Sequence, residues 1–144
     1  MPDDAFVNKL SGFLKNETEK AAIQHKQEVL EARVIKANAP KQWQELRDWV
    51  KAVCEQVNRD SGAKAMIFRD APSKELLVDI RVGAHDRLLR AIFDEPTSTI
   101  SYNNGRGKFT PFVASNGFGY SDGSNQVTIE EMGQMLIQSA IDMR

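Results

Sequence analysis

The chain contains a single cysteine, Cys54, so the sequence excludes an internal disulfide. A zinc site takes four ligands, and the two histidines, His25 and His85, are not accompanied by carboxylates spaced to complete one. Long apolar runs are also missing, since no stretch approaches the roughly 18 apolar residues of a membrane span. The N-terminus has no basic or apolar segment of the signal-peptide kind. We therefore expect a cytoplasmic protein without a membrane-bound part.

The chain also lacks an excess of either charge. It has 19 basic and 20 acidic residues, and the residues before and after position 60 are each close to balance. Proteins held to nucleic acid or to a membrane surface by bulk charge carry a basic domain or a basic face. The balance therefore argues against a nucleic-acid partner and against a membrane.

Recognised patterns of catalytic and cofactor sites are scarce too. There is no GxxxxGK[ST] phosphate loop. We identify no nucleophile motif that accompanies His25 or His85. The run after Asp122 does not follow the spacing of a calcium loop. Cys54 belongs to the apolar face of a predicted helix, where a small core residue is expected. The sequence thus predicts no catalytic residue, no metal ligands and no cofactor.

The sequence does contain helices and strands in separate blocks. Residues 1–60 have helical periodicity, residues 61–127 have short strand-like runs, and residues 128–144 have one more helix. Separate blocks favour an α+β fold over an alternating α/β fold. We predict a single α+β domain over residues 1–144. It consists of an N-terminal helical hairpin, an antiparallel meander of about five strands and a C-terminal helix packed on one sheet face.

The first predicted helix begins at Asp3 or Asp4, either of which can cap it. Two interpretations remain for residues 28–36, a continued helix to about residue 37 or a strand, and the helix propensity of this segment favours the helix. The apolar stripe of the helix leaves surface for a partner or a second copy. Its residues are Phe6, Leu10, Phe13 and Leu14.

A helix break is expected at Asn38-Ala39-Pro40, because proline suits the first turn of a new helix. A second helix then covers about residues 41–58 with the strongest helical periodicity of the chain. Gly62 follows as a C-terminal cap. In the last helix, Thr128 and Glu131 form a capping box, and Gly133 indicates close packing.

Five predicted strands cover residues 64–69, 75–82, 87–93, 98–102 and 108–114, and a weaker run covers 118–121. Strands this close together in the sequence pair antiparallel. Pro111 cannot donate a ladder hydrogen bond, so its strand is expected at an edge or with a bulge. An edge strand there would be open to an added strand from a partner.

Two glycine-rich loops, residues 103–108 and 115–125, are the candidates for binding a small ligand or a nucleotide. Backbone N–H groups and basic side chains in the first loop suit a phosphate, and aromatic side chains near the second suit a ring. The predicted ligand-binding residues are Tyr102, Asn104, Arg106, Lys108 and Phe118.

The absence of catalytic motifs and the spare helix surface favour a small, non-enzymatic protein-interaction or accessory module. We expect it to bind a protein partner or to self-associate, with a homodimer as the simplest form. The alternative is a small-ligand or nucleotide-binding domain that uses the two glycine-rich loops.

Overall fold

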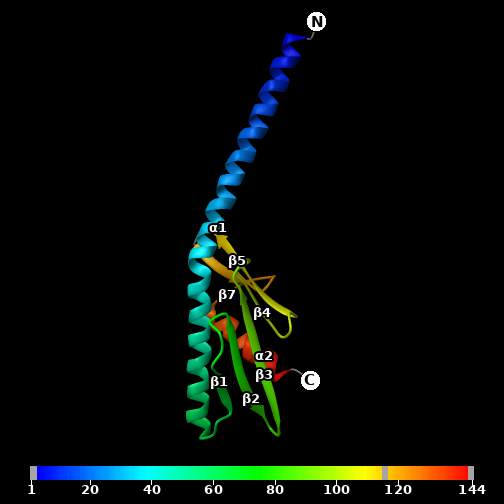
Figure 1. The fold of residues 1–144 in the computed structure, drawn as a ribbon. Coiled ribbons are helices and arrows are strands. Elements are labelled where there is room, and N and C mark those ends of the chain that lie inside the picture. The colour runs from blue at the N-terminus through cyan, green and yellow to red at the C-terminus, as the bar shows by residue number, and fades with distance from the viewer. Residues whose placement is uncertain (1–2, 115–116, 143–144) are drawn as a thin grey trace. The chain divides into compact units, whose positions relative to one another are not determined.

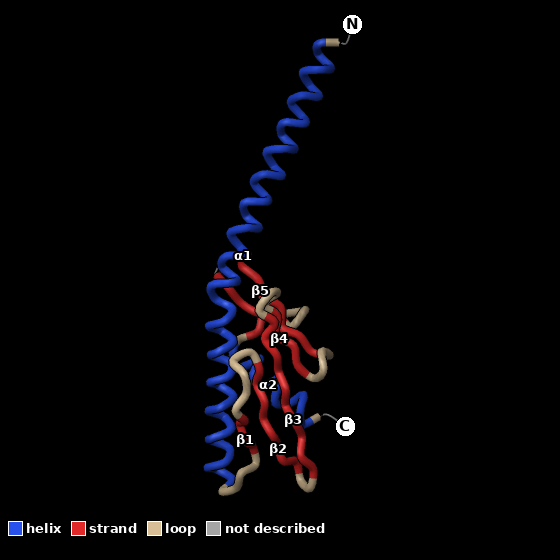
Figure 2. Tube along the Cα trace, in the orientation of Figure 1, coloured by secondary structure: helices blue, strands red, loops and turns tan. Residues whose placement is uncertain are grey.

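The computed structural model describes residues 3–114 and 117–142 (Figure 1). The fold is α+β, with a long N-terminal helix, an antiparallel sheet of seven strands over these residues and a C-terminal helix (Figure 2). The predicted fold class is confirmed. The elements are α1 Asp4–Ser61, β1 Met66–Arg69, β2 Glu75–Val82, β3 His85–Asp94, β4 Thr99–Tyr102, β5 Gly107–Ala114, β6 Gly117–Ser121, β7 Gln126–Val127 and α2 Ile129–Ile141.

The chain divides into two compact units, Met1–Val34 and Ile35–Arg144. The first unit is helical, and each of its residues from 3 to 30 is exposed. The second unit holds every residue of the hydrophobic core. Because residues 3–30 are all exposed, they do not form a second hydrophobic core. The division into two units does not test the predicted single domain over residues 1–144, which stays a prediction.

Helix α1 begins as the sequence predicts. The side-chain oxygen of Asp3 accepts a hydrogen bond from the N–H of Ala5 at 3.1 Å, which satisfies one of the amides left free at a helix N-terminus. Residues 28–36 are helical, so the favoured interpretation is confirmed and the strand is wrong. At the other end, Gly62 takes a φ of 67°, as a C-terminal cap requires.

The predicted hairpin is wrong, because α1 continues through Pro40 as one helix. Proline inside a helix costs about 3 kcal/mol. However, Ile35 and Ala39 before the proline pack in the same core as Trp43 and Leu46 after it. These positions stay on one helical face only if the helical phase continues through residue 40. Burying large side chains is worth about 1.5 to 3 kcal/mol each, which outweighs the cost of the proline.

The strands follow one another in the sheet in chain order, from β1 to β7, and every pair is antiparallel. The predicted strand 75–82 has the observed bounds, and Leu76, Val78 and Ile80 are buried as its alternation predicts. Seven strands replace the expected five, because residues 117–121 pair with β5 and the two-residue β7 pairs with β6.

Pro111 lies in a strand that has neighbours on both sides, so the prediction of an edge strand was wrong for β5 as a whole. Strand β4 is only four residues long, and its ladder with β5 ends at the pair Ile100–Phe109. Beyond that point β5 pairs with β6, where Pro111 lies opposite Tyr120. Proline is tolerated there because no β4 ladder bond is lost.

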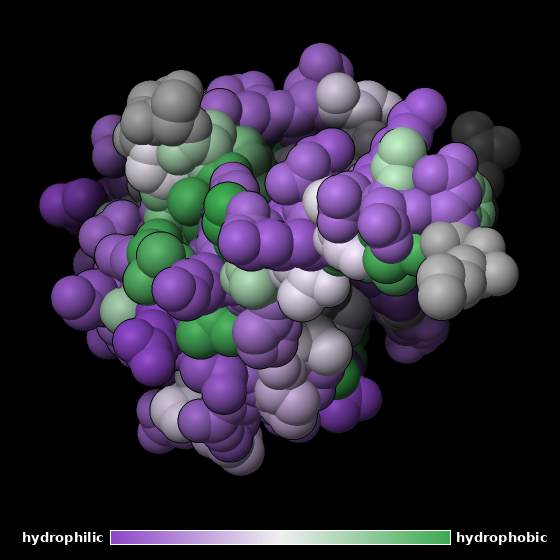
Figure 3. All heavy atoms as spheres, turned by 90° about the horizontal axis from the view of Figure 1, so that it is seen from above, coloured by the Kyte–Doolittle hydropathy of each residue, from purple (hydrophilic) through white to green (hydrophobic). Residues whose placement is uncertain are grey.

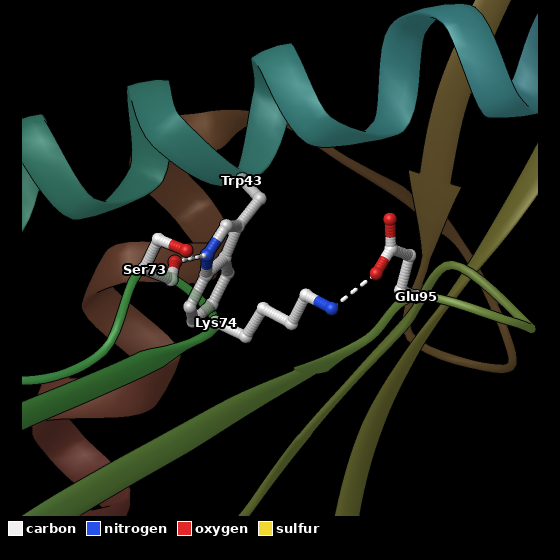
Figure 4. Close-up of polar contacts among 4 residues, drawn as sticks. All are labelled: Trp43, Ser73, Lys74 and Glu95. Carbon is white, nitrogen blue, oxygen red and sulfur yellow. Dashed lines mark hydrogen bonds and ion pairs between the residues drawn. The ribbon is translucent and has the colours of Figure 1, made fainter.

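The core lies between one face of the sheet and the two helices. Trp43 connects α1 to the sheet: its indole N–H donates to the carbonyl of Ser73 at 2.7 Å, and its ring stacks on Phe93 with centroids 5.8 Å apart. Figure 4 shows this bond beside an ion pair between Lys74 and Glu95. Because both contacts of Trp43 lie in the second unit, they fix the C-terminal part of α1 on the sheet.

Helix α2 has the predicted capping box. The N–H of Glu131 donates to the Thr128 hydroxyl at 3.1 Å, and the N–H of Thr128 donates to the Glu131 carboxylate at 3.3 Å. Gly133 is buried, and a Cβ atom at this position would overlap the ring of Trp49 on α1. The close packing expected at Gly133 is therefore a helix–helix contact, in which glycine makes room for an indole.

Candidate functional site

An exposed apolar face is the main feature of the first unit. At 100° per residue, five large side chains of α1 fall within about 120° of the helix circumference. Phe6 is 62% exposed, Phe13 59% and Leu14 54%. Every residue from 3 to 30 is exposed. We call it the apolar stripe: Phe6, Val7, Leu10, Phe13 and Leu14.

Basic side chains flank the apolar stripe. Lys9 lies beside one edge and Lys15 beyond the other, and residues 5–16 contain no acidic side chain. Acidic residues follow only from Glu17 onward, where Glu17 forms an exposed ion pair with Lys20 at 3.7 Å. Asp3 and Asp4 precede this segment, and at 100° per residue Asp3 and Glu17 fall on the same side of the helix as the stripe, so residues 3–17 carry a charge of −1 and the stripe has no excess of positive charge.

The second unit has a groove between the C-terminal part of α1 and helix α2, with a volume of about 630 Å³. The contact of Trp49 with Gly133 brings the two helices together beside it. Apolar side chains and amides make most of its lining, two carboxylates complete it, and none of its lining residues is basic. We call it the helix groove: Trp49, Val53, Asp122, Asn125, Val127, Glu131, Gln134, Met135, Ile137 and Gln138.

The two carboxylates of the helix groove are held by backbone hydrogen bonds. Asp122 accepts from the N–H groups of Ser124 at 2.9 Å and of Asn125 at 2.8 Å. These bonds lower the pKa of the Asp122 carboxyl because they favour its charged form. Glu131 is fixed by the capping box. Backbone hydrogen bonds thus fix the positions of both carboxylates.

The face of the sheet opposite the helices is open and of mixed character. Ile67 is 47% exposed and Leu88 44% exposed. Two arginines of this face pair with carboxylates on neighbouring strands, Arg69 with Asp79 and Arg90 with Glu75, each at 3.2 Å. These cross-strand pairs reduce the positive field that a phosphate backbone would need. Figure 3 shows the molecule from above, turned by 90° from the view of Figure 1, and hydrophobic residues are exposed there among hydrophilic ones.

The structure places the predicted ligand-binding residues at separate points. Tyr102 lies opposite Gly107 on β5 and Phe118 opposite Val113, so six residues of β5, about 20 Å, separate them. Lys108 is paired with Ser101, on the other face of the sheet from Tyr102. Tyr102, Asn104 and Arg106 belong to one hairpin, whereas Phe118 lies away from Tyr102 along β5.

Two backbone amides of the loop at residues 103–106 donate hydrogen bonds within the hairpin itself. The N–H of Gly105 donates to the Tyr102 carbonyl at 3.2 Å, and the N–H of Arg106 donates to the Asn103 carbonyl at 3.1 Å. These two amides are therefore not free to bind a phosphate. Asn104 lines a cavity of about 200 Å³ with Leu88 and Arg90. In the second loop, residues 117–121 form β6, while positions 115 and 116 lie outside the described residues.

Two titratable side chains of the core, Cys54 and Tyr120, have raised pKa values. Burial raises the pKa of the Cys54 thiol to about 11, which keeps it protonated and unreactive at neutral pH. Burial also raises the pKa of Tyr120, whose hydroxyl donates to the Ser98 carbonyl at 2.7 Å. Among the described residues, no group of three or more His, Cys, Asp or Glu side chains could hold a metal ion.

Sequence reasoning found every residue of the apolar stripe except Val7, because helical spacing is visible in the sequence. It missed the helix groove, whose lining comes from α1, α2 and the segment 122–127. Gly133 was the one signal of this site, since glycine inside a helix indicates close approach of another element.

Of the described residues, no helix is long and apolar enough to cross a membrane. No protein-family model, no curated protein and no solved structure matches this chain.

Proposed function

We propose that this chain is a protein-interaction module that self-associates through the apolar stripe of its N-terminal helix. The observation that carries the proposal is the exposure of five large apolar side chains on one face of the N-terminal helical unit, in which every residue from 3 to 30 is exposed. Scattered exposed apolar residues are common on protein surfaces, but a continuous apolar face indicates an interaction site.

The energetics favour a reversible complex. Full burial of each large apolar side chain contributes about 1.5 to 3 kcal/mol. Association costs about 4 to 15 kcal/mol in lost rigid-body freedom. The stripe has five such side chains, so the net gain is modest. We therefore expect self-association that depends on protein concentration in the micromolar range, where the binding free energy is about −8 kcal/mol.

Light scattering across a concentration range tests this proposal, with two matched variants. Leu10→Glu places a charge in the middle of the stripe, where Leu10 is 43% exposed. Asn8→Glu places the same charge about 160° around the helix from the centre of the stripe. We expect the mass of the wild type and of Asn8→Glu to rise with concentration, and Leu10→Glu to stay monomeric. A wild type that is monomeric at every concentration would contradict the proposal.

A further inference from the structure

We propose that the side chain of Asn58 closes the free edge of strand β1 and keeps this edge from pairing with β1 of a second copy. The inference is independent of the self-association proposed above, because it concerns the sheet of the second unit and not the apolar stripe. It gives one polar side chain of α1 the place that a neighbouring strand would take.

Strand β1 is an edge of the sheet, since the strand order begins at β1 and ends at β7. An edge strand offers unpaired N–H and C=O groups to any strand that approaches it, and native proteins protect such edges. Strand β7 has only two residues, so it offers little backbone for pairing. Strand β1 has four residues, so its edge has the greater need of protection.

The ladder with β2 determines which groups of β1 face the free edge. Just before β1, the carbonyl of Ala65 accepts from the N–H of Arg81 on β2 at 2.8 Å. In an antiparallel ladder, hydrogen-bonded pairs alternate with pairs that do not bond. Counting along the ladder from Ala65, Met66 and Phe68 are the residues that do not bond to β2. Their backbone N–H and C=O groups therefore point to the free edge.

Asn58 binds both edge-facing groups of Met66. Its side-chain nitrogen Nδ2 donates to the Met66 carbonyl at 2.7 Å, and its oxygen Oδ1 accepts from the Met66 N–H at 2.9 Å. A side-chain amide has a donor and an acceptor as a peptide group does, so Asn58 imitates one bonded pair of an added strand. Because Met66 is 6% exposed, water has little access to replace these bonds.

The rest of this edge borders open space. A cavity of about 330 Å³ lies between α1 and β1, and Asn58 lines it together with Met66, Ile67 and Phe68. The backbone groups of Phe68 face the same edge as those of Met66. Asn58 therefore closes the edge at one residue, while Phe68 borders the cavity beside it.

A second copy of β1 fits this edge in a register that uses both residues. With Ile67 of each copy on a twofold axis, Met66 of one strand lies opposite Phe68 of the other, and each such pair bonds through its edge-facing groups. The two Ile67 side chains, each 47% exposed in the single molecule, then meet across the axis. Both bonded pairs of this register need the backbone groups of Met66, which Asn58 occupies. Asn58 thus blocks both pairs at once.

Asn58→Ala on the full chain tests the proposal in a Leu10→Glu background, which damages the stripe. Gln56→Ala in the same background is the matched control, because it removes an exposed amide from the same helix two residues away. By sedimentation velocity we expect the Asn58→Ala chain to dimerise as the concentration rises, beyond any association of the control. The difference between the two chains is the readout, so it does not depend on the function proposed for the stripe. Equal mass at every concentration would overturn the proposal.

Hydrogen exchange shows whether β1 is the contact. In dilute solution we expect the Met66 amide to exchange about tenfold faster in Asn58→Ala than in the wild type, which is the effect of losing one hydrogen bond. At high concentration the amides of Met66 and Phe68 should both become protected in the variant. A dimer in which Phe68 stays unprotected would place the contact elsewhere and would overturn the proposal.

Two further variants keep the test valid. Asn58→Leu serves where Asn58→Ala does not fold, because leucine keeps the shape of the side chain, removes both polar atoms and has the better helix propensity. Ile67→Lys added to either variant places like charges opposite each other at the twofold axis, and we expect it to weaken dimerisation by about tenfold. A dimer of unchanged strength in Ile67→Lys would contradict the pairing of β1 with β1.

Discussion

Helix α1 contains two stretches with similar periodicity and opposite environments. In residues 4–34, Phe6, Leu10 and Phe13 lie on one face and are exposed. In residues 35–61, Trp43, Leu46 and Val50 lie on one face and are buried against the sheet. The apolar residues recur at helical spacing in both stretches. The difference is that the second stretch is buried in the core of the second unit, whereas residues 3–30 are exposed.

This contrast shows how far an apolar pattern determines structure. Periodicity indicates that a helix has a face to bury, but not what buries it. A monomeric helix without tertiary packing is marginal in water, since most helical stability in proteins comes from the packed face. We infer that residues 4–34 depend on an intermolecular contact for the support that residues 35–61 obtain from the core.

The largest expected effect comes from truncating a matched leucine in each stretch. Leu46 is fully buried, so Leu46→Ala removes apolar contacts and leaves a cavity. We expect it to lower the free energy of unfolding by about 2 to 5 kcal/mol. Leu10→Ala should change it by less than about 1 kcal/mol, because Leu10 is outside the core. Urea denaturation measures both, and equal losses would contradict the contrast between the stretches.

Substitution of two glycines, Gly133 in the second unit and Gly12 in the first, tests the same comparison between buried and exposed positions. A Cβ at Gly133 would overlap the Trp49 ring, so Gly133→Ala is expected to destabilise the second unit by about 1 to 3 kcal/mol despite the better helix propensity of alanine. Gly12 has no atom within 4 Å of a Cβ built at that position. Gly12→Ala should therefore stabilise the helix by about 1 kcal/mol, because alanine has the better helix propensity. Thermal denaturation followed by circular dichroism tests both, and a stabilising Gly133→Ala would refute the close helix contact.

A smaller effect is expected at alkaline pH, and it belongs to the second unit. Burial raises the pKa of the Cys54 thiol from 9.0 to about 11. The folded state therefore binds this proton more tightly, so the contribution to stability is complete below pH 9.0 and is lost as the pH rises toward about 11. Burial raises the pKa of Tyr120 as well, which adds to the loss above its ordinary value of 10.0.

We expect the free energy of unfolding to fall by on the order of 1 to 2 kcal/mol between pH 8 and pH 11. Cys54→Ala should make this decline shallower, because the variant has no thiol to titrate. Urea denaturation of both proteins at several pH values measures the difference. The same slope in Cys54→Ala would show that the thiol does not contribute.

Much of the fold was predictable because its signals are local. The alternation of Leu76, Val78 and Ile80 gives the face of β2, and Thr128 with Glu131 gives the start of α2. The path through Pro40 was not predictable. The local cost of proline favours a break, and only the shared core of Ile35 and Trp43 shows that the helix continues.

The same distinction between local and long-range signals applies to the candidate site. The apolar stripe is a single stretch of helix, so its residues are adjacent in sequence as well as in space. The helix groove joins Trp49, Asp122 and Met135 from three distant segments. No local pattern links such positions, and they come together only through the packing of α1, the sheet and α2.

The most direct test of the account is amide hydrogen exchange of the two stretches of α1 as a function of protein concentration. We predict that residues 39–54 are protected at every concentration, because the core covers their apolar face. Amides of residues 4–34 should exchange rapidly in dilute solution and become protected as the concentration rises and the stripe is covered. Strong protection of residues 4–34 in the most dilute sample, or none in the most concentrated, would contradict the claim that this stretch is supported by a second molecule.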